Sequence, residues 1–169
     1  MQGIPHIFTV GNKLEVLRAA RMGEEFGKSF LYKGAGDEYQ RLEAIAALEA
    51  AVILPLDFPT PYDVSDPYDA ELVDLADLKH WEMAPTNAAR LHRADVTIAF
   101  TIHDLKKKDK WMEQLRKAIE AGLPEAEALR ALTLTPANLI SAAEQLGTLE
   151  AGKLANFLVT SGPIFDKKT

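Results

Sequence analysis

One weak candidate for chemistry is a glycine-rich turn that joins a predicted strand to a predicted helix. Gly34 and Gly36 flank an alanine there, and the paired carboxylates of Asp37 and Glu38 follow. The turn lacks the third glycine of a dinucleotide-binding fingerprint and the Lys-Ser/Thr pair of a phosphate-binding loop, so it is a weak signal for nucleotides. The dipole of the following helix accounts for the two carboxylates without any chemistry.

The densest run of charge is basic, and acidic residues surround it. The run comprises Lys106, Lys107, Lys108 and Lys110, with Asp104 and Asp109 beside it. Such a run at a helix start is typically solvated, with phosphate binding as the alternative. The formal net charge of -6 argues against a general nucleic-acid binder, which usually presents a basic face.

Several other classes of site and protein are excluded. The chain has no cysteine, which rules out disulfides and thiolate metal sites and leaves the compartment open. It has no Gly-x-Ser-x-Gly elbow and no His-Glu-x-x-His helix. No apolar run approaches the ~20 residues that span a membrane.

These residues must be positioned by four short apolar runs that alternate with helical patterns. The predicted strands are 4–10, 29–32, 52–54 and 96–101. The predicted helices are 12–26, 37–50, 70–81, 86–93 and 107–121, followed by two that open at Pro124 and at Thr135-Pro136. This alternation implies a parallel sheet of right-handed βαβ units, which fits either half of an eight-fold barrel or a small doubly wound sheet.

Individual ends of these elements have their own signals. Asn12 is expected to cap the first helix, with Glu15 closing a capping box. Thr135 is expected to cap the last helix, with Pro136 at its first position. The irregular stretch 55–67 is rich in Pro, Asp and Tyr, and long loops of this kind are usually functional or mobile.

The last predicted strand, 156–160, has no obvious partner. It follows a tight turn and an exposed loop in "GTLEAGKLANFLVT", after a run of helices. A lone strand cannot satisfy its own backbone N–H and C=O groups, so a partner sheet must exist elsewhere.

Two stretches suggest where that partner lies. "AGLPEAEALRALTLTPANLI" followed by "LGTLEAGKLANFLV" resembles the closing segment of the amidohydrolase superfamily, near its imidazolonepropionase-like branch. The resemblance is specific over 123–159 and looser over 4–101. In that family a Gly-(Ser/Thr)-(Ile/Leu)-Glu-x-Gly-Lys turn returns the chain to a small β-sandwich beside the barrel. The other strands of the sandwich precede the first barrel strand.

The resemblance implies an α/β fold that is half of a TIM (β/α)8 barrel, about four parallel strands with helices, plus a C-terminal strand of the small β-sandwich. Residues 1–146 would form the C-terminal half of the barrel, and 147–169 the returning segment of the sandwich. The chain is therefore expected to be the C-terminal part of a larger protein. Its expected partner is the missing N-terminal half of the barrel or a second copy of itself.

Family members are expected to use zinc or another divalent metal that acidifies a bound water. Its ligands lie at the ends of strands five, six and eight, at the carboxyl face of the barrel. The resemblance carries these positions onto Thr9, Lys33 and His103, or onto Asp104 if the last register slips by one residue. Threonine is a poor ligand and a protonated lysine repels a cation. The prediction is a degenerate site in which this chain holds no metal.

An alternative is a site rebuilt from Lys33, His103 and Asp104. A lysine in a desolvated pocket can act as a base or a nucleophile. His80 and Trp81 resemble a stretch of one subgroup of the family and could line a substrate pocket, although packing explains a tryptophan equally well.

The resemblance implies that the intact protein is a hydrolase for C–N bonds of a cyclic amide or a dipeptide-like small molecule, and not an endoprotease. This segment alone is expected to be inactive. The alternative function is a non-catalytic, degenerate barrel that serves as a structural or binding module. Neither function involves nucleic acid or a membrane.

Overall fold

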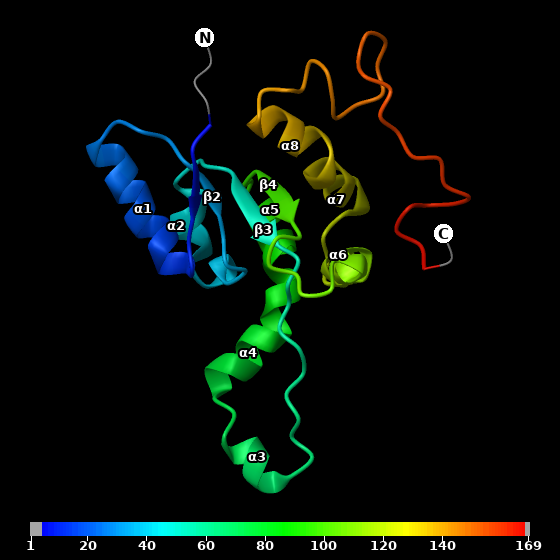
Figure 1. Cartoon of the computed structure of the whole chain (residues 1–169). Helices are drawn as coiled ribbons and strands as arrows, with labels where there is room; N and C mark the ends of the chain where they lie inside the picture. Colours follow the sequence, from blue (N-terminus) through cyan, green and yellow to red (C-terminus); the bar gives the residue numbers. More distant parts are fainter. Residues whose placement is uncertain (1–4, 168–169) are drawn as a thin grey trace.

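A parallel sheet forms the centre of the computed structural model, which describes residues 5–167 (Figure 1). Its strands are β1 (Ile7–Thr9), β2 (Leu31–Lys33), β3 (Val52–Pro55) and β4 (Ile98–Thr101), and they lie in the order β1-β2-β3-β4. All three pairings are parallel. The order follows the sequence without the reversal of a doubly wound sheet, as in a barrel.

The strand register brings the four carboxyl ends to one edge of the sheet. Thr9 lies opposite Lys33, Lys33 lies opposite Ile53, and Pro55 lies opposite Thr101. The residues that follow each strand are therefore neighbours in space, although they are far apart in the sequence. The predicted parallel sheet is confirmed; Ile4, with which the first predicted strand begins, lies outside the described residues, as do the last two residues of 147–169.

Helices follow each strand and cover the sheet. The α-helices are α1 (Lys13–Glu25), α2 (Leu42–Ala46), α3 (Pro67–Glu71), α4 (Leu75–Met83), α5 (Asn87–Arg93), α6 (Trp111–Glu120), α7 (Glu125–Leu132) and α8 (Leu134–Leu139), and the 3-10 helices are η1 (Glu38–Arg41), η2 (Ala84–Thr86) and η3 (Lys108–Lys110). None of the helices between residues 5 and 167 is long and apolar enough to cross a membrane.

The start of α1 forms as its sequence predicts, with one difference. The Asn12 side chain accepts hydrogen bonds from the backbone N–H groups of Leu14 and Glu15, at 3.0 and 3.1 Å. The Glu15 carboxylate reaches back to the N–H of Gly11, at 2.6 Å, one residue earlier than a capping box requires. The cap therefore fixes the chain that leaves β1 as well as the helix.

The core packs the sheet against the helices. Its fully buried side chains come from strands and helices alike, and include Val16, Val52, Leu91, Ile98 and Leu115. Each such side chain stabilises the fold by about 1.5–3 kcal/mol relative to exposure. The core packs the four strands together, and with them the edge that carries their carboxyl ends.

Residues 57–83 form an arm that projects beyond the sheet after β3 and carries α3 and α4 (Figure 1). None of its side chains is buried, and Tyr68 and Leu72 are about four-fifths exposed. The single helix predicted for 70–81 is therefore two helices. The first begins early because the Asp66 side chain caps it at the N–H of Tyr68, with Pro67 at the first position.

Two other predictions about elements were wrong. The helix predicted for 37–50 is the 3-10 turn η1 followed by the short α2. The last helix begins at Leu134 with Thr133 at its N-cap position, so Thr135 lies inside the helix and is buried. The segment 156–160, predicted as a strand whose partners lie outside this chain, forms no β-ladder within the described residues, and Phe157, Leu158 and Val159 are exposed. No strand lies beside it in this part of the chain to accept its backbone hydrogen bonds. The sandwich strand therefore stays a prediction.

The C-terminal segment returns to the helices at Phe165, whose side chain is buried in the core. The Arg116 guanidinium donates to the backbone carbonyls of Phe165 and Asp166, both at 2.7 Å. This clamp closes the end of the chain onto α6 without a strand.

Candidate functional site

A pocket of about 400 Å³ lies at the carboxyl ends of the strands. Each of the four strands contributes to its wall, through the residues at its end or directly after it: Thr9, Val10, Gly11, Lys33, Gly34, Ala35, Pro55, Asp57 and Asp104. Loops at this edge carry the active sites of parallel α/β barrels. The pocket is therefore the candidate site.

An ion pair crosses the pocket. Lys33 Nζ donates to Asp104 Oδ2 at 2.5 Å, and the lysine side chain is 16% exposed while the aspartate side chain is 43% exposed. Lys33 ends β2, and Asp104 follows β4. A pair with one exposed partner stabilises a fold by about 1 kcal/mol or less. Its position in the pocket is therefore more informative than its contribution to stability.

His103 does not join this pair. Its side chain is exposed and is not among the residues that line the pocket. The backbone N–H of His103 donates to Thr101 Oγ1 at 3.1 Å, in the turn that ends β4. Of the two alternatives for this position, the structure brings Asp104, and not His103, to Lys33. Thr9 also lines the pocket, at the end of β1.

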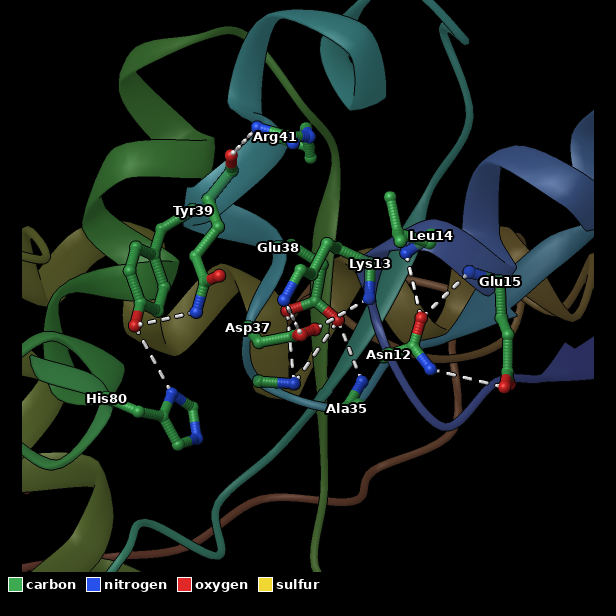
Figure 2. Close-up of polar contacts among 12 residues, drawn as sticks. Asn12, Lys13, Leu14, Glu15, Ala35, Asp37, Glu38, Tyr39, Arg41 and His80 are labelled. Atoms are coloured by element: carbon green, nitrogen blue, oxygen red, sulfur yellow. Dashed lines mark hydrogen bonds and ion pairs between the residues drawn. The ribbon is translucent and has the colours of Figure 1, made fainter. Parts of the chain in front are cut away.

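Glu38 is buried and folds back onto the turn that follows Lys33 (Figure 2). Its carboxylate accepts hydrogen bonds from the N–H of Ala35 at 2.7 Å and from the N–H of Gly36 at 3.1 and 3.2 Å. Asn87 Nδ2 donates to it at 2.6 Å. The helix dipole is therefore the wrong explanation for this residue, because its carboxylate is committed to the turn and to α5.

Asp37 also has a specific partner. Its carboxylate accepts a hydrogen bond from the N–H of Lys13 at 2.8 Å and pairs with Lys13 Nζ at 3.1 Å. It thereby ties the first turn of α1 to the turn after β2. A glutamate within four residues of a Gly-x-Gly turn is a sequence signal for folding back onto N–H groups, but nothing local in the sequence points to Asn87.

His80 and Trp81 lie at the foot of the arm, outside the pocket. The His80 ring stacks on Tyr39, with ring centroids 6.1 Å apart, and its Nδ1 shares a hydrogen bond of 3.3 Å with the tyrosine hydroxyl (Figure 2). Trp81 is 40% exposed. Neither residue contacts the Lys33–Asp104 pair, and His80 instead fastens α4 to η1.

Comparison with known proteins identifies the family of this chain. The model of the amidohydrolase family matches residues 85–169. The chain belongs to the amidohydrolase family. No curated protein sequence matches it.

Two solved structures share this fold. An amidohydrolase from Thermotoga maritima is 25% identical with a TM-score of 0.75, and the match covers 98% of this chain and 40% of that one. A prolidase complexed with N-methylphosphonate-L-proline is 18% identical with a TM-score of 0.61, and the match covers 88% of this chain and 36% of that one. At that identity the prolidase supports the fold alone.

The fold is thus part of an amidohydrolase TIM barrel, and the chain spans 40% of the length of the Thermotoga protein. The family match does not distinguish the imidazolonepropionase-like branch, which stays a prediction.

Amidohydrolases generally use divalent metals, so it matters which side chains of the pocket could bind such an ion. Residues 5–167 contain no group of three or more His, Cys, Asp or Glu side chains that could hold a metal. Two of the strand ends present a threonine hydroxyl, at Thr9, and an ammonium group, at Lys33. The ammonium group already neutralises Asp104. A catalytic zinc site has three protein ligands of the carboxylate, imidazole or thiolate kind, and this pocket offers only the carboxylates of Asp57 and Asp104, so its residues do not fit such an ion.

Proposed function

We propose that this chain forms the C-terminal part of the barrel of an amidohydrolase-family hydrolase that cleaves C–N bonds of small molecules. The substrate class is a cyclic amide or a dipeptide-like compound, and internal peptide bonds of proteins are excluded. The observation that carries the proposal is the Lys33–Asp104 pair in the pocket at the carboxyl ends of the strands. Family membership and the likeness to the Thermotoga amidohydrolase support hydrolysis as the reaction class.

The two side chains of the pair have complementary roles in this proposal. The Lys33 ammonium group, held by Asp104, faces the pocket and stabilises the negative charge that develops on a substrate carbonyl oxygen. Asp104 is partly exposed, so a free lone pair of its carboxylate can accept a proton from an attacking water. Water adds to the carbonyl carbon, the C–N bond breaks, and the same carboxyl group returns the proton to the leaving nitrogen.

The proposal also covers the role of metal in the reaction and the source of the rest of the barrel. The residues of this chain hold no metal in the reaction. The rest of the barrel is supplied either by the part of the family's barrel that this chain does not cover or by a second copy. Within the described residues β1 and β4 each pair on one side only, and an open sheet edge favours such an addition. The 169-residue chain alone is inactive because only part of the pocket wall is present.

The test uses the protein at its natural length, assayed against a panel of cyclic amides and dipeptides. Lys33→Met and Asp104→Asn should each lower kcat/KM by about 10²-fold or more, the usual effect of losing an oxyanion donor or a general base. Lys153→Met is the matched control, since Lys153 is 15% exposed and pairs with Glu150 at 3.5 Å outside the pocket. Activity that survives either pocket substitution would refute the proposed roles.

The second candidate function is a non-catalytic module, and the side chains at Thr9 and Lys33 favour it because neither suits a metal-dependent hydrolase. In that case the natural-length protein hydrolyses nothing in the panel.

A further inference from the structure

We propose that Glu38 is a positioning residue for Lys33, and that Asn87 holds Glu38 in that role. The inference rests on the proposed function, because it gives the Lys33–Asp104 pair a supporting structure. The buried carboxylate of Glu38 holds the backbone of the turn at residues 34–36. Because this turn directly follows Lys33, it determines the position of the Lys33 ammonium group. Neither Glu38 nor Asn87 lines the pocket, so they act only through the turn.

The carboxylate of Glu38 is saturated by neutral donors. Oε1 accepts from Ala35 N and Gly36 N, and Oε2 accepts from Gly36 N and from Asn87 Nδ2. Glu38 is 0% exposed and forms no ion pair among the described residues. A buried carboxylate without a cation is costly unless hydrogen bonds compensate it. An apolar side chain would fill the space at lower cost, so the carboxylate serves to hold the turn.

The turn that Glu38 holds is continuous with the pocket. Gly34 and Ala35 line the pocket beside Lys33. The backbone of Lys33 is already held laterally, since its carbonyl accepts from Val10 N at 3.0 Å and the next N–H donates to Ile53 O at 3.0 Å. Glu38 adds the restraint on the carboxyl side, where the strand pairing ends.

The approach between Gly34 and Glu38 shows that the turn is built around the carboxylate. A Cβ atom at position 34 would overlap Glu38 Oε1, because the two atoms would be only 2.1 Å apart. Only glycine admits this contact.

Asn87 bonds to both Glu38 and the backbone of Tyr39. Its Nδ2 donates to Glu38 while its Oδ1 accepts from the N–H of Tyr39 at 2.8 Å, so the amide has one orientation that satisfies both. Asn87 begins α5, whose Leu91 is fully buried. The turn after Lys33 is therefore anchored to the core through a helix 49 residues further along the chain.

The test exchanges donor and acceptor across this contact in the full chain. In E38Q the new amide places an N–H donor either against the Asn87 Nδ2 donor or against the N–H groups of Ala35 and Gly36. In N87D a second carboxylate faces Glu38. In E38Q/N87D the hydrogen bond runs in the opposite direction, one acceptor remains for the N–H of Tyr39, and the net charge equals that of the wild type.

The first measurement is the rate at which acetic anhydride labels Lys33 Nζ, read by mass spectrometry against Lys153 in the same molecule. Each single variant should raise the rate about fivefold, as expected when a pair of this exposure is released. E38Q/N87D should restore the wild-type rate. Unchanged labelling in folded single variants, or no rescue in the folded double variant, would overturn the proposal.

The second measurement needs no variant. Ala35 and Gly36 lie outside the helices and strands, so their amides should exchange fast with solvent unless the carboxylate holds them. Slow exchange of both is expected, and exchange at the rate of a free loop would contradict the inference even if every variant failed to fold.

Hydrolysis separates this inference from the proposed function. If the natural-length enzyme is active, the single variants should lower kcat about 10²-fold, the cost of a displacement of roughly 1 Å, with E38Q/N87D rescuing it. If E38Q/N87D restores the labelling rate but the natural-length protein hydrolyses nothing, the proposed function is wrong and the positioning role is supported. If kcat is the same in the wild type and in all three variants, only the positioning role is refuted.

Discussion

Gly34→Ala tests directly whether the turn after β2 is built around a buried carboxylate. The backbone at Gly34 lies outside the left-handed region, so conformational entropy alone predicts that alanine stabilises the protein by about 0.4–1 kcal/mol. The contacts predict the opposite. The new Cβ would lie 2.1 Å from Glu38 Oε1 and 2.9 Å from Glu38 Cδ, so the carboxylate must leave its place.

The magnitude follows from what the carboxylate loses. It gives up the N–H groups of Ala35 and Gly36 and the amide of Asn87, and hydrogen bonds to charged groups contribute about 1.5–3 kcal/mol each without adding fully. Removing the partner of a buried charge in an ion pair costs about 3–5 kcal/mol, and the loss of these hydrogen bonds is of the same order. For a chain of this length that loss lowers Tm by about 10 °C.

The assay is urea unfolding followed by circular dichroism, with Gly11→Ala as the matched control. A Cβ at Gly11 meets only the flexible end of Glu15, at 3.3 Å, so its free energy of unfolding should stay within about 0.5 kcal/mol of the wild type. Gly34→Ala combined with Glu38→Ala should cost less than the sum of the two single changes, because both remove the same interaction. A stabilised or unchanged Gly34→Ala protein would refute the reasoning.

Three further outcomes are expected. Lys33→Met and Asp104→Asn should each change the free energy of unfolding by about 1 kcal/mol or less, because the pair is partly exposed; a larger loss by urea titration would make the pair structural. Burial, and secondly the charge of Glu24, raises the pKa of Tyr32, so its contribution to stability is full below its ordinary pKa and is lost as the pH rises through the raised value. Unfolding measured from about pH 9 to about pH 11 should therefore show a steeper loss for the wild type than for Tyr32→Phe, and equal slopes would contradict this. Phe165→Ala should cost about 3 kcal/mol and expose the segment 147–164 to limited proteolysis, since that side chain anchors the C-terminal segment in the core; an unchanged cleavage pattern would show that the Arg116 clamp suffices.

The parallel sheet could be predicted from the sequence because its signals are local. Apolar runs, caps and breakers recur at the spacing that each element needs, and α1 begins at Asn12 as expected. The strand at 156–160 could not be judged in this way. A strand forms only where a neighbour accepts its hydrogen bonds, and the neighbours predicted for this one lie outside the chain, so it stays a prediction.

The candidate site was harder to predict, for two different reasons. The choice between His103 and Asp104 depends on a single turn, in which Thr101 Oγ1 accepts the N–H of His103. The role of Glu38 depends on Asn87, 49 residues away, and long-range polar contacts leave no periodic signal. From the local sequence, the helix dipole was a sufficient explanation for the Glu38 carboxylate. The structure shows instead that the carboxylate accepts hydrogen bonds from the turn and from Asn87.

The geometry of the sheet explains why a lysine stands at the end of β2. Asp104 follows β4, and β3 lies between the two strands, so the two strand ends are separated by two strand spacings, about 10 Å. A histidine or aspartate at position 33 is too short to cross that distance, whereas the extended stem of a lysine reaches Asp104 Oδ2. Pro55, which ends β3, lines the same pocket as Lys33. Lys33 therefore supplies a fixed positive charge between non-adjacent strands, provided that the turn behind it is held, which is the role of Glu38.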